Sequence, residues 1–134
     1  MLTLAPERPK SKPEAILLEV LSQPDADARV AEALPWVVRR YAGQMDFRRL
    51  SRQAKLRDLQ NRMGFVLEAA GTNKRGVAEA LGDLEGARLL RESTLCWDSM
   101  PAATRQWMRT SRSSRARHWN MLSMLETEGK LDAA

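Results

Sequence analysis

Apolar residues recur at helical spacing along most of this chain. The clearest run comprises Leu56, Leu59, Met63, Val66, Leu67 and Ala70. Intervals of three or four residues dominate this run, so its members share one side of a helix. Gly71 follows directly, at the position where a left-handed residue commonly ends a helix. The pattern predicts a helix from Arg57 to Ala70.

The N-terminal half predicts three further helices. The stretch from Ser11 to Glu14 has the form of a capping box with proline at the first helical position, and it opens a helix that ends near Ser22. Asp25 or Asp27 caps the second helix, which Pro35 should kink or restart. Asp46 caps the third, from Phe47 to about Ala54. Their expected inward-facing residues are Val30, Leu34, Val37, Val38, Tyr41, Phe47, Leu50 and Ala54.

The C-terminal half adds further helical segments. Thr72 or Asn73 begins one whose apolar stripe is Val77, Leu81, Leu84, Ala87 and Leu90. The stretch 91–97 is ambiguous and is compatible with an extended segment. Ser99 with Pro101 begins the next helix, and Ser113 or Ser114 begins the last, which should end near Glu128 and Gly129. No repeat, heptad array or convincing strand pair is found. The expected fold class is all-α, a compact multi-helix domain.

Length and composition set the organisation of the chain. Its 134 residues suffice for one domain with a real core, and 43% apolar with 29% charged residues is a globular composition. We expect a flexible N-terminal arm (1–12), a helical core domain (13–92) and a basic C-terminal helical segment rich in Trp and Met (93–134). The single cysteine excludes an intramolecular disulfide. With no long apolar run and no signal-like N-terminus, we expect a cytoplasmic protein without a membrane partner.

Charge is unevenly distributed along the sequence. Arg39 to Arg62 carries eight basic side chains against Asp46 and Asp58, a charge of +6, and Ser99 to Leu125 carries five arginines and no acid, a charge of +5. Because the whole chain sums to +5, the other segments must sum to −6. Such separation favours a polyanionic partner. Arginine outnumbers lysine 17 to 5, and arginine suits bidentate contacts with phosphate and guanine.

Two of the predicted helices, Phe47–Ala54 and Arg57–Ala70, have the size of a helix-turn-helix. The second would read base edges, with Arg57, Gln60 and Asn61 facing away from its apolar stripe. The first helix and the turn would supply phosphate contacts through Arg48, Arg49, Arg52 and Lys55. The turn lacks the glycine of the common version. A plain antiparallel helix pair with a solvated charged face is the alternative.

A resemblance supports the regulatory interpretation. The run from Leu59 to Gly71, with its arginine–apolar–glycine–aromatic–aliphatic–leucine order, resembles a helix of bacterial antitoxins of the abortive-infection type. It covers thirteen of the 134 residues. The resemblance implies a DNA-binding repressor with a second surface for a cognate nucleotidyltransferase toxin. A helix-turn-helix protein commonly dimerises to bind two half-sites, so a homodimer is expected, with DNA preferred over RNA.

The C-terminal segment combines aromatic residues with arginines. Trp107, Met108 and Trp119 are of the types enriched at interface cores, and they are the expected partner-binding residues. The expected solvent-facing, nucleic-acid-binding arginines are Arg105, Arg109, Arg112 and Arg115. The absence of acids between Ser99 and Leu125 favours an interaction arm. The alternative is that the tryptophans belong to the core.

No catalytic constellation is found. His118 and Cys96 lack partners at the spacing of a catalytic or metal site, and the Gly71–Gly76 turn lacks the lysine and hydroxyl of a phosphate loop. We therefore expect no enzyme activity, no cofactor and no metal. The competing function is a non-enzymatic interaction or accessory subunit of a larger complex, either RNA-containing or phage-related.

Overall fold

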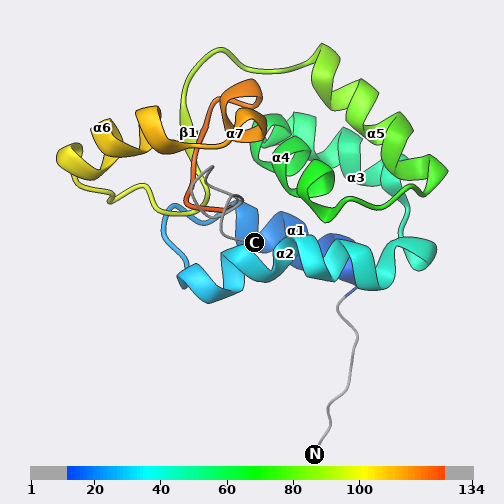
Figure 1. Ribbon diagram of the computed structural model, residues 1–134. Coiled ribbons are helices and arrows are strands. Elements are labelled where there is room, and N and C mark those ends of the chain that lie inside the picture. Colours follow the sequence, from blue (N-terminus) through cyan, green and yellow to red (C-terminus); the bar gives the residue numbers. More distant parts are fainter. Residues whose placement is uncertain (1–11, 126–134) are drawn as a thin grey trace, which may run out of the picture.

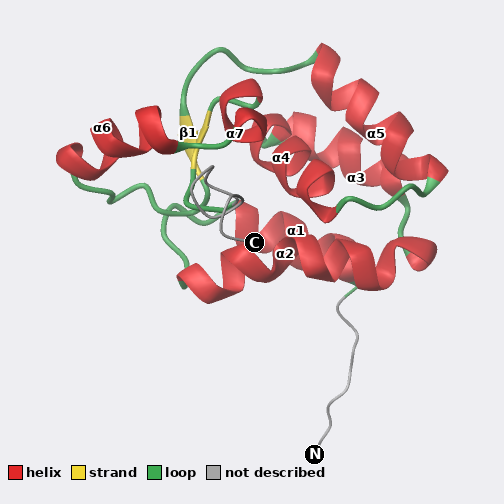
Figure 2. Cartoon of the chain, in the orientation of Figure 1, coloured by secondary structure: helices red, strands yellow, loops and turns green. Residues whose placement is uncertain are grey.

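The structure, a computed structural model, describes residues 12–125 (Figure 1). The helices in this range are α1 (Pro13–Leu21), α2 (Ala28–Tyr41), α3 (Phe47–Leu56), α4 (Gln60–Ala70), α5 (Arg75–Gly86), α6 (Ala102–Ser111) and α7 (Ser114–His118). A 3-10 turn, η2 (Ala42–Gln44), follows α2. Two short strands, β1 (Ser93–Thr94) and β2 (Met121–Leu122), pair in parallel. The all-α prediction is confirmed, and the strands are a minor addition (Figure 2).

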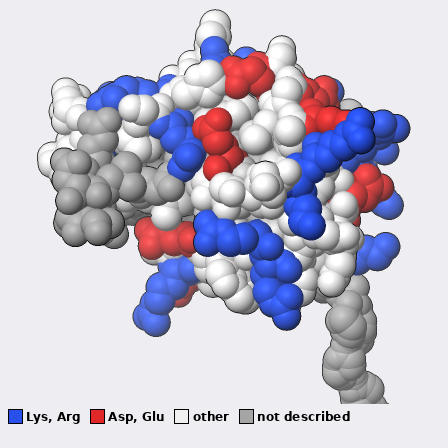
Figure 3. Space-filling model, turned by 45° about the vertical axis from the view of Figure 1, so that its right-hand side comes forward, with Lys and Arg blue, Asp and Glu red and all other residues white. Residues whose placement is uncertain are grey.

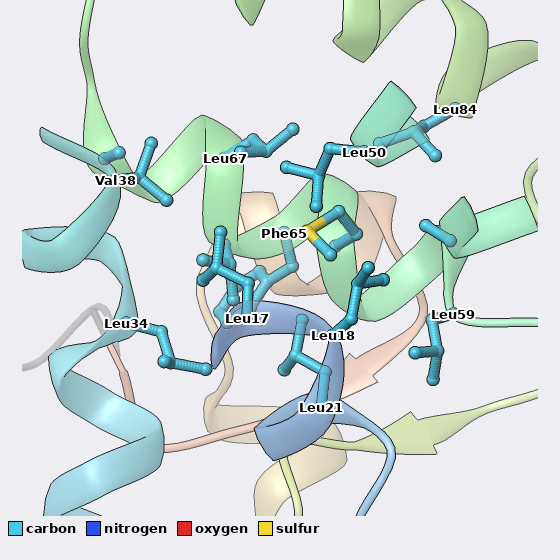
Figure 4. Packing of buried hydrophobic residues seen from close by; sticks show 14 of the residues in the cluster. Leu17, Leu18, Leu21, Leu34, Val38, Leu50, Leu59, Phe65, Leu67 and Leu84 are labelled. Carbon is cyan, nitrogen blue, oxygen red and sulfur yellow. The ribbon is translucent and has the colours of Figure 1, made fainter. Parts of the chain in front are cut away.

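Helix α4 is the centre of the domain. It contacts α1, α2, α3, α5, α7 and both strands. Figure 4 shows Phe65 and Leu67 of α4 among leucines from α1, α2, α3 and α5. Phe65, Val66 and Leu67 are consecutive and all buried, so the apolar surface of α4 extends round the helix. A helix that is apolar on every side is normally buried.

Several predicted helix boundaries are confirmed by the caps. The Asp27 and Asp46 carboxylates accept backbone N–H groups at the starts of α2 and α3, and the Ser113 hydroxyl does so for α7. Gly71 ends α4 with a positive φ of 66°, as its position predicted. Pro35 lies inside α2 without a restart of the helix, because buried residues on both sides of it, Leu34 and Val38 among them, hold the helix in the core.

Helix α1 begins at Pro13, with Lys12 as an N-cap that makes no side-chain bond. The rest of the predicted arm, residues 1–11 with Ser11 among them, lies outside the described residues.

Other boundaries were predicted wrongly. Helix α5 ends at Gly86, and Leu90 is 90% exposed rather than inward-facing. Helix α7 has only five residues, because the chain turns at Asn120 (φ 54°) and enters β2. The predicted end near residues 128–129 lies outside the described range. The β1–β2 pair was missed because two-residue strands carry no periodicity and are paired only by tertiary proximity.

Part of the C-terminal segment belongs to the main core, while Met100, Met108 and Leu122 form a small cluster of their own. Leu95, Cys96, Trp119 and Met121 belong to the same buried cluster as Leu17 and the rest of the N-terminal helices. The predicted boundary between 92 and 93 therefore does not separate two hydrophobic cores. Burial of Trp119 argues against a detachable interaction arm, at least as far as Leu125.

Candidate nucleic-acid interface

Helix α3 presents a basic outward face. Its apolar side, formed by Phe47, Leu50 and Ala54, is buried against the domain. Arg48, Arg49 and Arg52 lie on the opposite side and are exposed, and Arg57 follows at the C-cap. Within residues 12–125, none of these four guanidinium groups has an ion-pair partner. This face is therefore available to an anionic ligand.

Three acidic side chains near α3 are already engaged. The Lys55 ammonium donates to Asp83 at 2.7 Å, and the Ser51 hydroxyl donates to the same carboxylate at 2.9 Å. These two hydrogen bonds, that of Lys55 first, lower the pKa of Asp83 below its ordinary value. Asp46 caps α3, and the Glu14 carboxylate accepts the Asp46 backbone N–H at 2.7 Å. Lys55 is thus half-buried and paired, unlike the predicted free phosphate contact.

A groove of about 730 Å³ separates α1 from α3. Lys12, Arg49 and Arg57 line it together with Glu14 and Glu19. The mixed charge makes this groove a weaker anion site than the outward face of α3.

Gln60 and Asn61 do not face solvent, so the prediction of an exposed reading face on α4 is wrong. Asn61 is 2% exposed; its side-chain amide donates to the Leu89 carbonyl and accepts the Leu89 N–H, both at 2.8 Å. The Gln60 amide donates to the Ala87 carbonyl at 3.0 Å. These bonds satisfy the backbone of the segment that leaves α5. The sequence did contain a signal for the burial of this side of α4. Gly64 and Phe65, a small and an aromatic residue, lie opposite the apolar stripe.

The four C-terminal arginines are engaged by acceptors from the protein. Arg109 makes two 2.9 Å bonds to Glu92, and Arg115 lies 3.3 Å from Glu68. Arg112 donates to the Met121 carbonyl, and Arg105 donates to the carbonyls of Met100 and Asp98. Only Arg109 among the four is largely exposed. The expectation that all four face solvent is wrong, because Glu92 and Glu68 from other segments bind Arg109 and Arg115, and backbone carbonyls bind Arg105 and Arg112.

Figure 3 accordingly shows basic and acidic side chains interspersed over one face of the molecule. The charge separation of the sequence is therefore only partly retained in three dimensions.

The three predicted partner-binding residues differ in exposure. Trp119 is 1% exposed and packs beside Gly64, and Met108 is 2% exposed, so neither is available to a partner. Trp107 is 50% exposed. The expected contact surface is thus reduced to Trp107, with Trp97 at 39% exposure on a neighbouring loop.

The described residues contain no group of three or more His, Cys, Asp or Glu side chains arranged to hold a metal ion. None of the helices between residues 12 and 125 has the length and apolar character needed to cross a membrane. The Cys96 thiol is buried and bonded to the Val20 carbonyl, and desolvation raises its pKa.

No family model matches the chain, and no curated protein or solved structure shows significant similarity to it. The candidate interface therefore rests on geometry and charge alone.

Proposed function

We propose that this chain is a small nucleic-acid-binding protein that contacts phosphate groups through the outward face of α3. The observation that carries the proposal is the row of exposed guanidinium groups of Arg48, Arg49 and Arg52 along the outward side of α3, with exposed Arg57 at its C-cap. None of the four has an ion-pair partner within residues 12–125. Arginine donates two parallel hydrogen bonds to a phosphate, and such contacts supply most of the affinity of non-specific binding.

We favour phosphate contact by α3 over the reading of bases by α4. The side-chain amides of Gln60 and Asn61 on α4 are already hydrogen-bonded to the Ala87 and Leu89 backbone. A DNA-binding repressor of the antitoxin type would be a more specific form of this function. In that form α3 would lie against the DNA, and a homodimer would span two half-sites.

The test is the salt dependence of binding to a labelled duplex of generic sequence, measured by fluorescence anisotropy. Four phosphate contacts predict a slope of log K against log salt of about −3.6, a fall of about 150-fold between about 50 and 200 mM. Replacing one contact, in Arg52→Gln, should reduce the slope by about 0.9. Arg29→Gln is the matched control, because Arg29 is exposed in the first turn of α2, away from α3 (Figure 1).

Two results would reject the proposal. One is the absence of binding at about 50 mM salt, where electrostatic binding is strong. The other is an equal loss of affinity in Arg52→Gln and Arg29→Gln, which would indicate an effect of net charge rather than a contact by α3.

The exposed Trp107 and Trp97 favour a second candidate function, an accessory subunit that binds a larger protein. In that case Trp107→Ala should abolish co-purification with the product of a neighbouring gene and leave nucleic-acid affinity unchanged. Arg52→Gln should instead weaken nucleic-acid binding and leave co-purification unchanged.

A further inference from the structure

A second groove, of about 500 Å³, opens beside the basic face of α3. The turn between α3 and α4 forms one side of it, and the chain around β1 and before α6 forms the other. Four arginines from these separate segments line it: Arg57, Arg62, Arg91 and Arg105. Its walls are mostly polar, so it is suited to a charged ligand.

Two of the acids in the groove are already neutralised. Asp98 accepts hydrogen bonds from Arg62 at 3.1 Å and from the Thr94 hydroxyl at 2.6 Å. Glu92 is bound by Arg109 from α6 and lies 4.0 Å from Arg112. The pKa of Glu92 is lowered, first by the Arg109 hydrogen bond and also by the charge of Arg105.

Three arginines in the lining form no ion pair with a described residue. Arg57 and Arg91 have no ion-pair partner among the described residues, and Arg105 donates only to uncharged carbonyl oxygens. Asp58 is the one remaining acid in the lining without a described ion pair. The free charge of the groove is therefore positive.

The groove is continuous with the face of α3 through one residue. Arg57 lines this groove and also the groove between α1 and α3, where Arg49 lies. A hollow of about 500 Å³ has the size of small-molecule sites and accommodates about one nucleotide unit. A duplex is too wide to enter it, whereas the backbone of a single strand is not.

We propose that this groove binds the sugar–phosphate backbone of a single-stranded nucleic acid whose flanking phosphates lie on the outward face of α3. The inference rests on the proposed function and adds the strandedness of the ligand. Arg57 would bridge the two surfaces, and Arg91 and Arg105 would hold the phosphate inside the groove.

The test compares Arg91→Gln with the unmodified chain on two labelled probes, an oligothymidylate and a duplex. Arg91 makes no described side-chain hydrogen bond or ion pair, so its replacement should leave the fold intact. Loss of one single-strand contact predicts a fall of about fivefold in affinity for oligothymidylate at about 100 mM salt and a slope smaller by about 0.7. Affinity for the duplex should not change. Arg91→Lys should restore most of the loss, and Arg29→Gln is again the control.

The outcomes separate this inference from the proposed function. If Arg91→Gln binds oligothymidylate like the unmodified chain while Arg52→Gln weakens binding, the groove is not the site and α3 still is. If Arg91→Gln weakens the duplex and the single strand equally, the preference for a single strand is wrong. If neither probe binds, both proposals fail.

Discussion

Replacement of Gly64 by alanine tests how tightly the C-terminal segment packs on α4. A Cβ atom at this position would lie 2.4 Å from two ring carbons of Trp119 and 2.7 Å from a third. Ordinary van der Waals contact begins near 3.4 Å, so the ring must move by about 1 Å. It has little room to do so, because Trp119 is 1% exposed and its indole N–H donates to Glu68.

Two opposing contributions set the change in the free energy of unfolding caused by Gly64→Ala. Overpacking of a filled core costs about 1–3 kcal/mol. Alanine in place of glycine inside a helix contributes about 1 kcal/mol of stability. Because the 2.4 Å approach is far inside contact distance, the overpacking cost here lies in the upper part of that range, at about 2–3 kcal/mol. We therefore expect Gly64→Ala to lower the free energy of unfolding by about 1–2 kcal/mol, a large share of the net stability of a small domain.

The assay is urea denaturation followed by far-ultraviolet circular dichroism. Gly82→Ala on α5 is the matched control, because a Cβ there would meet nothing within 4 Å. It should stabilise the chain by up to about 1 kcal/mol. In a Trp119→Leu background the steric cost should disappear, so Gly64→Ala should become neutral or stabilising. The coupling energy between the two sites should be about 1–3 kcal/mol.

An unfolding free energy of Gly64→Ala equal to or above that of the unmodified chain would refute this packing. So would a cost that persists unchanged when Trp119 is leucine. Either result would show that Trp119 does not pack against Gly64 in the folded protein.

Two further predictions concern buried and surface polar contacts. Asn61→Ala should lower the unfolding free energy by about 1–3 kcal/mol, because it leaves the Leu89 N–H without its acceptor and the Leu89 carbonyl with only the longer bond from Asn120, at 3.4 Å. An unchanged urea midpoint would contradict that role. Asp83→Asn should destabilise the chain by less than about 1 kcal/mol at neutral pH, since the pair with Lys55 is partly exposed. The folded pKa of Asp83 lies below the ordinary 3.8, so its contribution is complete above that value and is lost as the pH falls through the folded pKa. Melting curves of the two proteins should therefore differ at neutral pH and converge in acid; a difference that grows in acid would contradict the sign of the shift.

The sequence by itself determined the helices and many of their ends. The spacing of apolar residues, the cap at Asp46 and the glycine at 71 are local signals, and each acts within a few residues of chain. The basic character of α3 was likewise predictable, because Arg48, Arg49 and Arg52 fall opposite Phe47 and Leu50 at helical spacing.

Only the tertiary structure decided which faces of the helices are exposed to solvent. Asn61 is buried because the distant Leu89 backbone supplies its partners. Arginines of the acid-free stretch from Ser99 to Leu125 are paired with Glu68 and Glu92 from elsewhere in the chain. The groove at Arg57 likewise depends on Arg91, which is brought to it by the fold. Such contacts depend on the packing of the whole domain around α4, and no pattern within a single helix encodes them.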